Sequence, residues 1–162
     1  MGLSAFGGAA VGCAALIFIR CYTAYLKARR DECLAFLSLL RELERGMSLY
    51  LESPLSVAAR LPEPALERSG FNARLKNGAS LSEAFDSAAD RLLIPSEAKR
   101  ILTEYFSHVG EGYLDGELRL IARTVSELEP IAAAERQELE KRSKVAGVLT
   151  FSAVAGVLIL LL

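Results

Sequence analysis

The chain has 162 residues, a length that suits one domain. Its 19 Lys and Arg residues nearly balance 20 Asp and Glu residues, so the net charge of −1 gives no reason to expect nucleic acid as a partner. Trp is absent and Cys occurs three times, which excludes a small secreted scaffold held by disulfides. All charged residues lie between Arg20 and Lys144, and the sequence on either side carries none.

The uncharged ends, Met1–Ile19 and Val145–Leu162, are each long enough to cross a bilayer as a helix. They correspond to about 29 and about 27 Å of helix, against a hydrocarbon core about 30 Å thick. A domain of this size could hardly bury two helices that are apolar on all sides. The sequence therefore predicts two transmembrane helices, residues 1–19 and 145–162, and a helical domain over residues 20–144.

Basic residues flank both predicted spans on the side of the central domain. There are seven of them: Arg20, Lys27, Arg29, Arg30, Lys141, Arg142 and Lys144. Since cytoplasmic flanks are enriched in Lys and Arg, we expect a cell-membrane protein whose central domain lies in the cytoplasm. A cleaved signal peptide would need basic residues before the apolar run, whereas here they follow it, so we expect an uncleaved anchor.

Helical periodicity recurs through the central region, and no segment alternates as a strand would. After the first predicted span, apolar positions continue at Leu34, Leu37 and Leu40. We expect the span and this stretch to form one long helix that Gly46 breaks.

Several short helical pieces are expected next. Ser53-Pro54 is typical of a helix start, with Ser as the cap and Pro in the first turn. A turn or two fits residues 63–68, ended by Gly70, and another short piece fits residues 71–77, closed by Gly78.

The clearest local pattern is a capping box, Ser80-Leu81-Ser82-Glu83, in which Ser80 and Glu83 satisfy each other's backbone amides. Apolar residues follow at helical spacing on both sides of Pro95: Leu81, Ala84, Phe85, Ala88, Ala89, Leu92 and Leu93, then Ala98, Ile101, Leu102, Tyr105, Phe106 and Val109. We expect an antiparallel helical pair joined at residues 94–96, with Phe85 buried.

A last long helix is expected to open at Asp115 or Gly116 and to run into the second span. Its predicted core-facing residues are Leu118, Ile121, Ala122, Val125 and Leu128. Pro130 is expected to kink this helix without ending it. The predicted fold class is therefore all-α, a cytoplasmic helical bundle flanked by an N-terminal and a C-terminal transmembrane helix.

The sequence offers no recognisable metal or redox site. The only histidine, His108, falls in the last turn of a predicted helix, where a cation is electrostatically favoured. The cysteines fit no zinc or redox spacing and are interpreted as small apolar fillers: Cys13, Cys21 and Cys33. We predict no metal and no cofactor.

No catalytic or nucleotide-binding pattern is found either. The glycines Gly110, Gly112 and Gly116 have the wrong spacing for a dinucleotide fingerprint and follow a helix, so a turn between helices is the better interpretation. Two acidic pairs lie in charged, solvated contexts: Glu83 with Asp86, and Glu127 with Glu129. We predict no catalytic residues, no enzyme activity and no small-molecule substrate.

The central region is acidic despite the overall balance. Residues 31–140 contain 20 acidic and 12 basic residues, a difference of −8. Such a surplus favours a basic partner, although it also serves solubility.

The layout of the chain resembles that of stage III sporulation protein AB of endospore-forming bacteria. An apolar N-terminal run followed by basic residues, a central helical region, and a charged helix entering a final Leu-rich run carry this resemblance. The segment from Gly78 to Phe85 also resembles the "G-x-S-L-x-x-A-hydrophobic" element of type II secretion and type IV pilus platform proteins. Residues 109–116 lie where those proteins have a glycine-bearing turn.

The resemblance implies a non-enzymatic platform subunit of a specialised secretion complex in the mother-cell membrane around the forespore. It implies contacts with other subunits of that complex and with a cytoplasmic secretion ATPase. Platform proteins usually carry two helical bundles and more spans, so this chain is expected to form homo-oligomers or to rely on other membrane subunits. The alternative is a membrane-anchored helical adaptor or regulator with no role in secretion.

Overall fold

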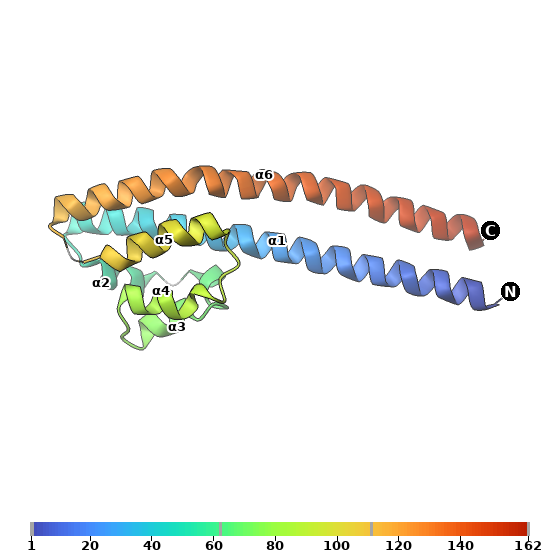
Figure 1. The fold of residues 1–162 in the computed structure, drawn as a ribbon, viewed down its shortest axis with the longest axis horizontal. Helices are drawn as coiled ribbons and strands as arrows, with labels where there is room; N and C mark the ends of the chain where they lie inside the picture. Colours follow the sequence, from blue (N-terminus) through green and yellow to red (C-terminus); the bar gives the residue numbers. More distant parts are fainter. Residues whose placement is uncertain (1, 62, 111, 162) are drawn as a thin grey trace. The chain divides into compact units, whose positions relative to one another are not determined.

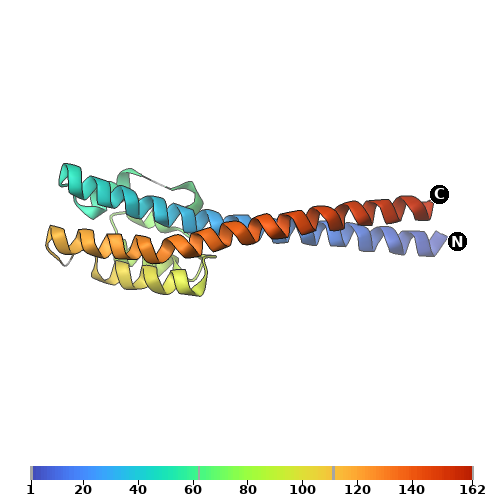
Figure 2. The same cartoon turned by 90° about the horizontal axis from the view of Figure 1, so that it is seen from above.

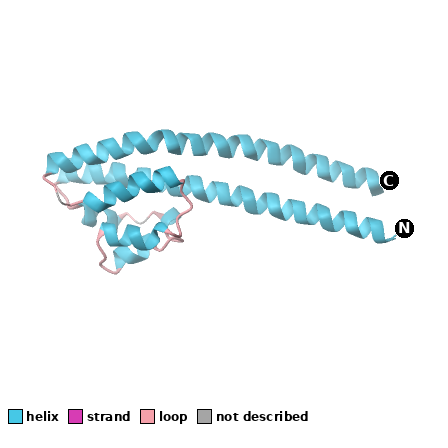
Figure 3. Ribbon diagram, in the orientation of Figure 1, coloured by secondary structure: helices cyan, strands magenta, loops and turns pink. Residues whose placement is uncertain are grey.

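The computed structural model describes the backbone of residues 2–61, 63–110 and 112–161. It describes side chains between residues 13 and 152, except at positions 15, 62, 111, 143, 146, 147 and 149–151. In this described part every regular element is a helix and none is a strand (Figure 3). The predicted all-α class is confirmed.

Two long helices begin and end the chain, and short helices lie between them in sequence (Figure 1). The elements are α1 (Gly2–Tyr50), α2 (Pro54–Arg60), the 3₁₀ helix η1 (Pro64–Leu66), α3 (Phe71–Lys76), α4 (Leu81–Ala89), α5 (Ser96–His108) and α6 (Leu114–Leu161). The chain divides into two compact units. The end unit comprises residues 1–27 and 135–162, and the helical domain comprises residues 28–134.

The end unit consists of the first half of α1 and the last part of α6. Within it, Arg142 donates a hydrogen bond to the Tyr22 hydroxyl and lies over the Tyr22 ring, 5.5 Å from its centroid. Among the residues that the structure describes, no helix combines the length and the hydropathy needed to cross a membrane. The predicted spans, Met1–Ile19 and Val145–Leu162, fall largely on residues whose side chains lie outside that description.

Phenylalanine rings from four helices form the centre of the helical domain. Phe36 of α1 makes edge-to-face contacts with Phe71 of α3 and Phe85 of α4, at centroid distances of 5.6 and 5.7 Å. Phe85 stacks on Phe106 of α5 at 4.7 Å. All four rings are essentially inaccessible to solvent, which confirms the predicted burial of Phe85. We call these four residues the aromatic core.

The prediction that Gly46 breaks the first helix is wrong, because α1 continues to Tyr50. Gly46 is buried inside α1 where α2 crosses it, and a Cβ atom at this position would lie 2.5 Å from Cγ2 of Val57. This glycine therefore permits a close approach of two helices. Of the apolar positions named after the first predicted span, Leu37 and Leu40 are buried, whereas Leu34 is exposed. Cys33 and Phe36 are fully buried on the same helix.

The predicted starts of α2 and α4 are confirmed. Ser53 caps α2 by accepting a hydrogen bond from Ser56 N, and Pro54 occupies the first position. Both bonds of the capping box are present at the start of α4, between Ser80 and Glu83. The predicted apolar face of α4 is buried, but the helix ends at Ala89, before the buried Leu92.

The last helix begins at Leu114, one residue before the earlier of the two predicted starts, and it passes through Pro130 without ending, as predicted. In the helical domain its residues Ile121 and Leu128 are fully buried, whereas Ala122 is exposed, contrary to prediction. Arg41 of α1 pairs with Glu129 of α6 at 2.7 Å, which shows that the two long helices lie next to each other in this unit.

Candidate functional site

His108 forms local contacts at the end of α5. The ring is exposed, and its Nδ1 lies 2.9 Å from the Glu104 carbonyl oxygen and 3.0 Å from Ser107 Oγ. These partners belong to the same helix turn. His108 therefore has a local role, in which its ring contacts polar groups of the last turn of α5.

The cysteines are not gathered at one place. Cys13 and Cys21 are exposed, whereas Cys33 is buried on α1, and all three are free thiols. Within the described part of the chain, no three His, Cys, Asp or Glu side chains are grouped so that they could hold a metal ion.

Three of the four acidic residues singled out in the sequence, Glu83, Glu127 and Glu129, have structural partners. Glu127 accepts a hydrogen bond from Arg123 at 2.8 Å, and Glu129 accepts one from Arg41 at 2.7 Å. Glu83 accepts the Ser80 backbone N–H, and this bond together with the Ser80 hydroxyl lowers the pKa of the Glu83 carboxyl below its ordinary value. Glu127 and Glu129 therefore pair with arginine side chains, and Glu83 caps the start of α4.

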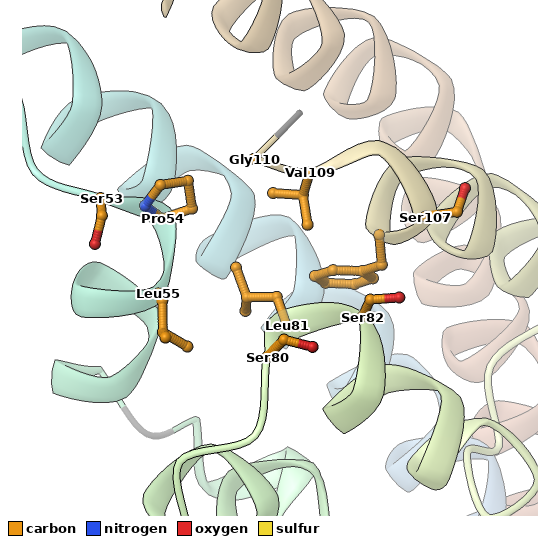
Figure 4. A pocket seen from close by; sticks show the side chains of 10 residues that line it. Ser53, Pro54, Leu55, Ser80, Leu81, Ser82, Ser107, Val109 and Gly110 are labelled. Carbon is orange, nitrogen blue, oxygen red and sulfur yellow. The ribbon is translucent and has the colours of Figure 1, made fainter. Parts of the chain in front are cut away.

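A hollow of about 360 Å³ opens on the helical domain where three chain segments converge (Figure 4). Residues 53–55 come from the start of α2, and residues 80–82 come from the start of α4. The end of α5 and the turn after it contribute Phe106, Ser107, Val109 and Gly110. Both short motifs from the sequence thus contribute to one hollow, the first through Ser80–Ser82 and the second through Val109 and Gly110.

The lining of the hollow is apolar with hydroxyl groups at several positions. Figure 4 shows Pro54, Leu81 and Val109 around the same space. None of the lining residues carries a titratable side chain. Several of its hydroxyls are already engaged in helix capping, as at Ser53 and Ser80. Such a lining suits contact with an apolar group and offers no acid, base or metal ligand.

Exposed large apolar side chains gather next to the hollow. In Figures 1 and 2 the end of α1, the end of α5 and the start of α6 lie at the same end of the helical domain. Six residues there are exposed, and we call them the apolar end: Leu49, Tyr50, Leu51, Leu55, Tyr113 and Leu114. Tyr113 is 93% exposed and Leu51 76% exposed, and Leu55 also lines the hollow.

Glu32 is a buried carboxylate that the sequence analysis missed. Its side chain is fully buried, and Arg68 donates a hydrogen bond of 2.7 Å to its Oε1. The backbone N–H of Leu93 donates to Oε2 at 2.6 Å. Glu32 therefore ties α1 to the turn before α3 and to the loop between α4 and α5. Glu32 lies four residues before the buried Phe36, on the same face of α1, but its charged neighbours Arg30 and Asp31 make it look like a surface residue in the sequence.

A second buried carboxylate, Glu117, lies near the start of α6. Its Oε1 accepts the backbone N–H of Gly110 at 2.6 Å, which holds the turn after α5 to the start of α6. Its Oε2 and the buried Tyr105 hydroxyl have no hydrogen-bond partner in the described structure. Burial raises the pKa of Tyr105, and the nearby negative charge of Glu117 raises it further.

A comparison of the chain with known protein families agrees with the resemblance seen in the sequence. The family described as stage III sporulation protein AB matches residues 4–162 of the chain. No curated protein and no solved structure matches it significantly.

Proposed function

We infer the function of this chain from its family, because it belongs to the stage III sporulation protein AB family, and its role is therefore connected with sporulation. We propose that it is a non-enzymatic platform subunit of a specialised secretion or channel complex. In this proposal both ends anchor it in the mother-cell membrane around the forespore, and its helical domain contacts a cytoplasmic secretion ATPase.

One observation supports a role in protein binding above all others. The hollow and the apolar end expose apolar surface on the helical domain, and the lining of the hollow contains no group for acid–base or metal chemistry. Exposed apolar surface of this kind is typical of contact sites for other proteins. A platform subunit would contact other proteins of the complex through such a surface.

The membrane arrangement is proposed from the sequence. Residues 1–19 and 145–162 contain no charged side chain, and seven basic residues lie just inside them. A Lys or Arg at the centre of a span opposes insertion by about 2.5–3.5 kcal/mol, so the charged middle of the chain is expected to remain on the cytoplasmic side.

A thiol-labelling experiment tests this arrangement. The three cysteines are replaced, and a single cysteine is introduced at the exposed position Glu97. We expect a membrane-impermeant maleimide to label this cysteine only after the membrane is opened. Labelling in intact cells would place the helical domain outside and contradict the proposed topology.

Co-purification tests the proposed ATPase contact. The full chain is tagged and extracted in mild detergent from sporulating cells, and the secretion ATPase is expected to co-purify with it. A matched extract from cells that lack the tag controls for non-specific recovery. If the extracted chain is folded and the ATPase is never recovered, the ATPase contact is wrong.

A further inference from the structure

The apolar end is a surface that the fold of the helical domain does not use. Tyr113 follows the Gly110 turn, and its side chain is almost fully exposed, although its carbonyl oxygen accepts bonds from Gly116 N and Glu117 N. The backbone is thus ordered while the ring is left in solvent. An ordered, exposed tyrosine three residues after Gly110, which lines the hollow, is the kind of residue that anchors protein interfaces.

The backbone at Leu51 adds a second feature. Leu51 has a φ of +54°, in the left-handed region where glycine is the residue normally found at the end of a helix. A bond from Glu52 N to the Gly46 carbonyl oxygen closes the end of α1 around it. The chain therefore places an exposed leucine where glycine would be conformationally easier.

Acidic residues outnumber basic ones in the segments that form the apolar end and the hollow. Residues 49–55, 80–86, 106–110 and 112–117 contain no Lys or Arg, and four of their acidic side chains are at least partly exposed: Glu52, Glu83, Asp86 and Asp115. Arg60 of α2 pairs with Glu52 at 3.0 Å and offsets that charge. The remaining surplus favours a partner with basic residues around an apolar contact.

We propose that the apolar end and the hollow bind a segment of a protein partner whose apolar residues are flanked by Lys and Arg. The inference rests on the proposed function in one respect, namely that the helical domain has a protein partner. It adds the surface and the chemistry of that partner.

The acidic charge of this surface favours a basic protein segment over two other possible partners, a second copy of the chain and an anionic lipid surface. A second copy of the chain that docked through the same end would bring two acidic surfaces together, and like charges across an interface oppose association. An anionic lipid surface would be repelled for the same reason. A basic-flanked protein segment matches both the apolar and the acidic parts of the surface.

Site-specific photocross-linking of the full chain in sporulating cells tests the proposal. Benzoylphenylalanine replaces Tyr50, an exposed aromatic residue of the apolar end, and the control places it at Ala73, an exposed residue of α3. The cross-linked peptide is then sequenced by mass spectrometry. We expect an adduct from position 50, and not from position 73, to a peptide whose apolar residues are flanked by Lys and Arg.

Substitutions sharpen this measurement. Tyr113→Ser removes a side chain that the fold does not bury, and we expect the adduct from position 50 to fall about tenfold or more, as for an aromatic anchor. Leu51→Gly is expected to lower the adduct while raising the denaturation midpoint of the chain. Leu34→Ser, at an exposed leucine elsewhere on the domain, is the matched control and should leave the adduct unchanged.

Several results would overturn the proposal. These are an adduct to a second copy of the chain, to lipid or to an acidic peptide, no adduct from position 50, or equal loss of the adduct in Tyr113→Ser and Leu34→Ser. An adduct to a basic-flanked peptide of a protein other than the ATPase would support the proposal and contradict the ATPase contact. If the ATPase is recovered but cross-links form only from position 73, the ATPase contact is supported and the proposal for the apolar end is contradicted.

Discussion

The aromatic core and the apolar end of the helical domain are built from similar side chains with opposite exposure. Phe36, Phe71, Phe85 and Phe106 are almost completely buried, whereas Tyr113 and its neighbours at the apolar end lie in solvent. The core residues come from the faces of helices that contact one another. The exposed residues come from helix ends and loops.

The difference separates residues that stabilise the helical domain from residues that we propose bind a partner. Burial of the four rings stabilises the domain, since each large apolar side chain contributes about 1.5–3 kcal/mol when it is removed from water. The apolar end contributes little to folding because its side chains remain exposed, and at Leu51 the backbone conformation is unfavourable. Substitutions in the aromatic core should therefore lower the free energy of unfolding, whereas substitutions at the apolar end should reduce binding of a partner.

The largest effect is expected in the aromatic core. Phe85→Ala should destabilise the domain by about 3–5 kcal/mol, because it removes a fully buried ring that contacts Phe36 and Phe106. Urea unfolding of the chain in detergent, followed by near-ultraviolet circular dichroism of the aromatic side chains, measures this loss. A change below about 1 kcal/mol would show that Phe85 is not part of a packed core.

A smaller loss is expected at the buried carboxylate. Glu32→Gln should destabilise the domain by about 1–3 kcal/mol, because it weakens charge-assisted hydrogen bonds from Arg68 and from the Leu93 N–H. The matched control is Glu129→Gln, whose ion pair with Arg41 is exposed and should be worth less than about 1 kcal/mol. Equal effects of the two substitutions in the same urea experiment would contradict the role of Glu32.

At the apolar end, a substitution is expected to raise the stability of the domain instead of lowering it. Leu51→Gly should stabilise the domain by about 1 kcal/mol, because glycine adopts the left-handed conformation without strain and the leucine side chain buries little surface. Thermal unfolding of the chain in detergent measures the shift of Tm. A clear destabilisation would mean that Leu51 packs against the domain.

The smallest effect is a dependence on pH at the start of α4. Because the pKa of Glu83 is lower in the folded chain than its ordinary value of 4.5, its contribution to stability is present above that value. This contribution is lost as the pH falls through the folded pKa. Glu83→Gln should therefore melt below the native chain at neutral pH and approach it in acid. A difference that stays constant across this range would contradict the role of the carboxylate.

The parts of the fold that depend on local sequence could be predicted. Helices α4 and α5 follow from apolar spacing, the start of α4 follows from the capping box, and the bounds of α5 follow from Pro95 and Gly110. The end of α4 at Ala89 does not follow from the apolar pattern, which continues to Leu93. The end of α1 could not be predicted in this way. A glycine such as Gly46 both ends helices and permits close contacts, and only the position of Val57 decides between these roles.

The candidate site was predictable only in its pieces. The Gly78–Phe85 and Val109–Gly116 segments are recognisable in the sequence, but their meeting at one hollow depends on how α4 and α5 pack. Glu32 lies beside charged neighbours in sequence and therefore looks like a surface residue. Its partners, Arg68 and Leu93, are 36 and 61 residues away, so only the tertiary structure identifies its burial.

The central claim is that the apolar end serves binding and not folding, and spore formation by the Tyr113→Ser chain tests it most directly. The variant replaces the native chain in a sporulating strain, with protein level and Tm measured in parallel. We expect an unchanged Tm, since the ring is 93% exposed, together with a fall in spore number toward that of a strain lacking the chain. Normal spore formation with a normally folded variant would contradict the claim.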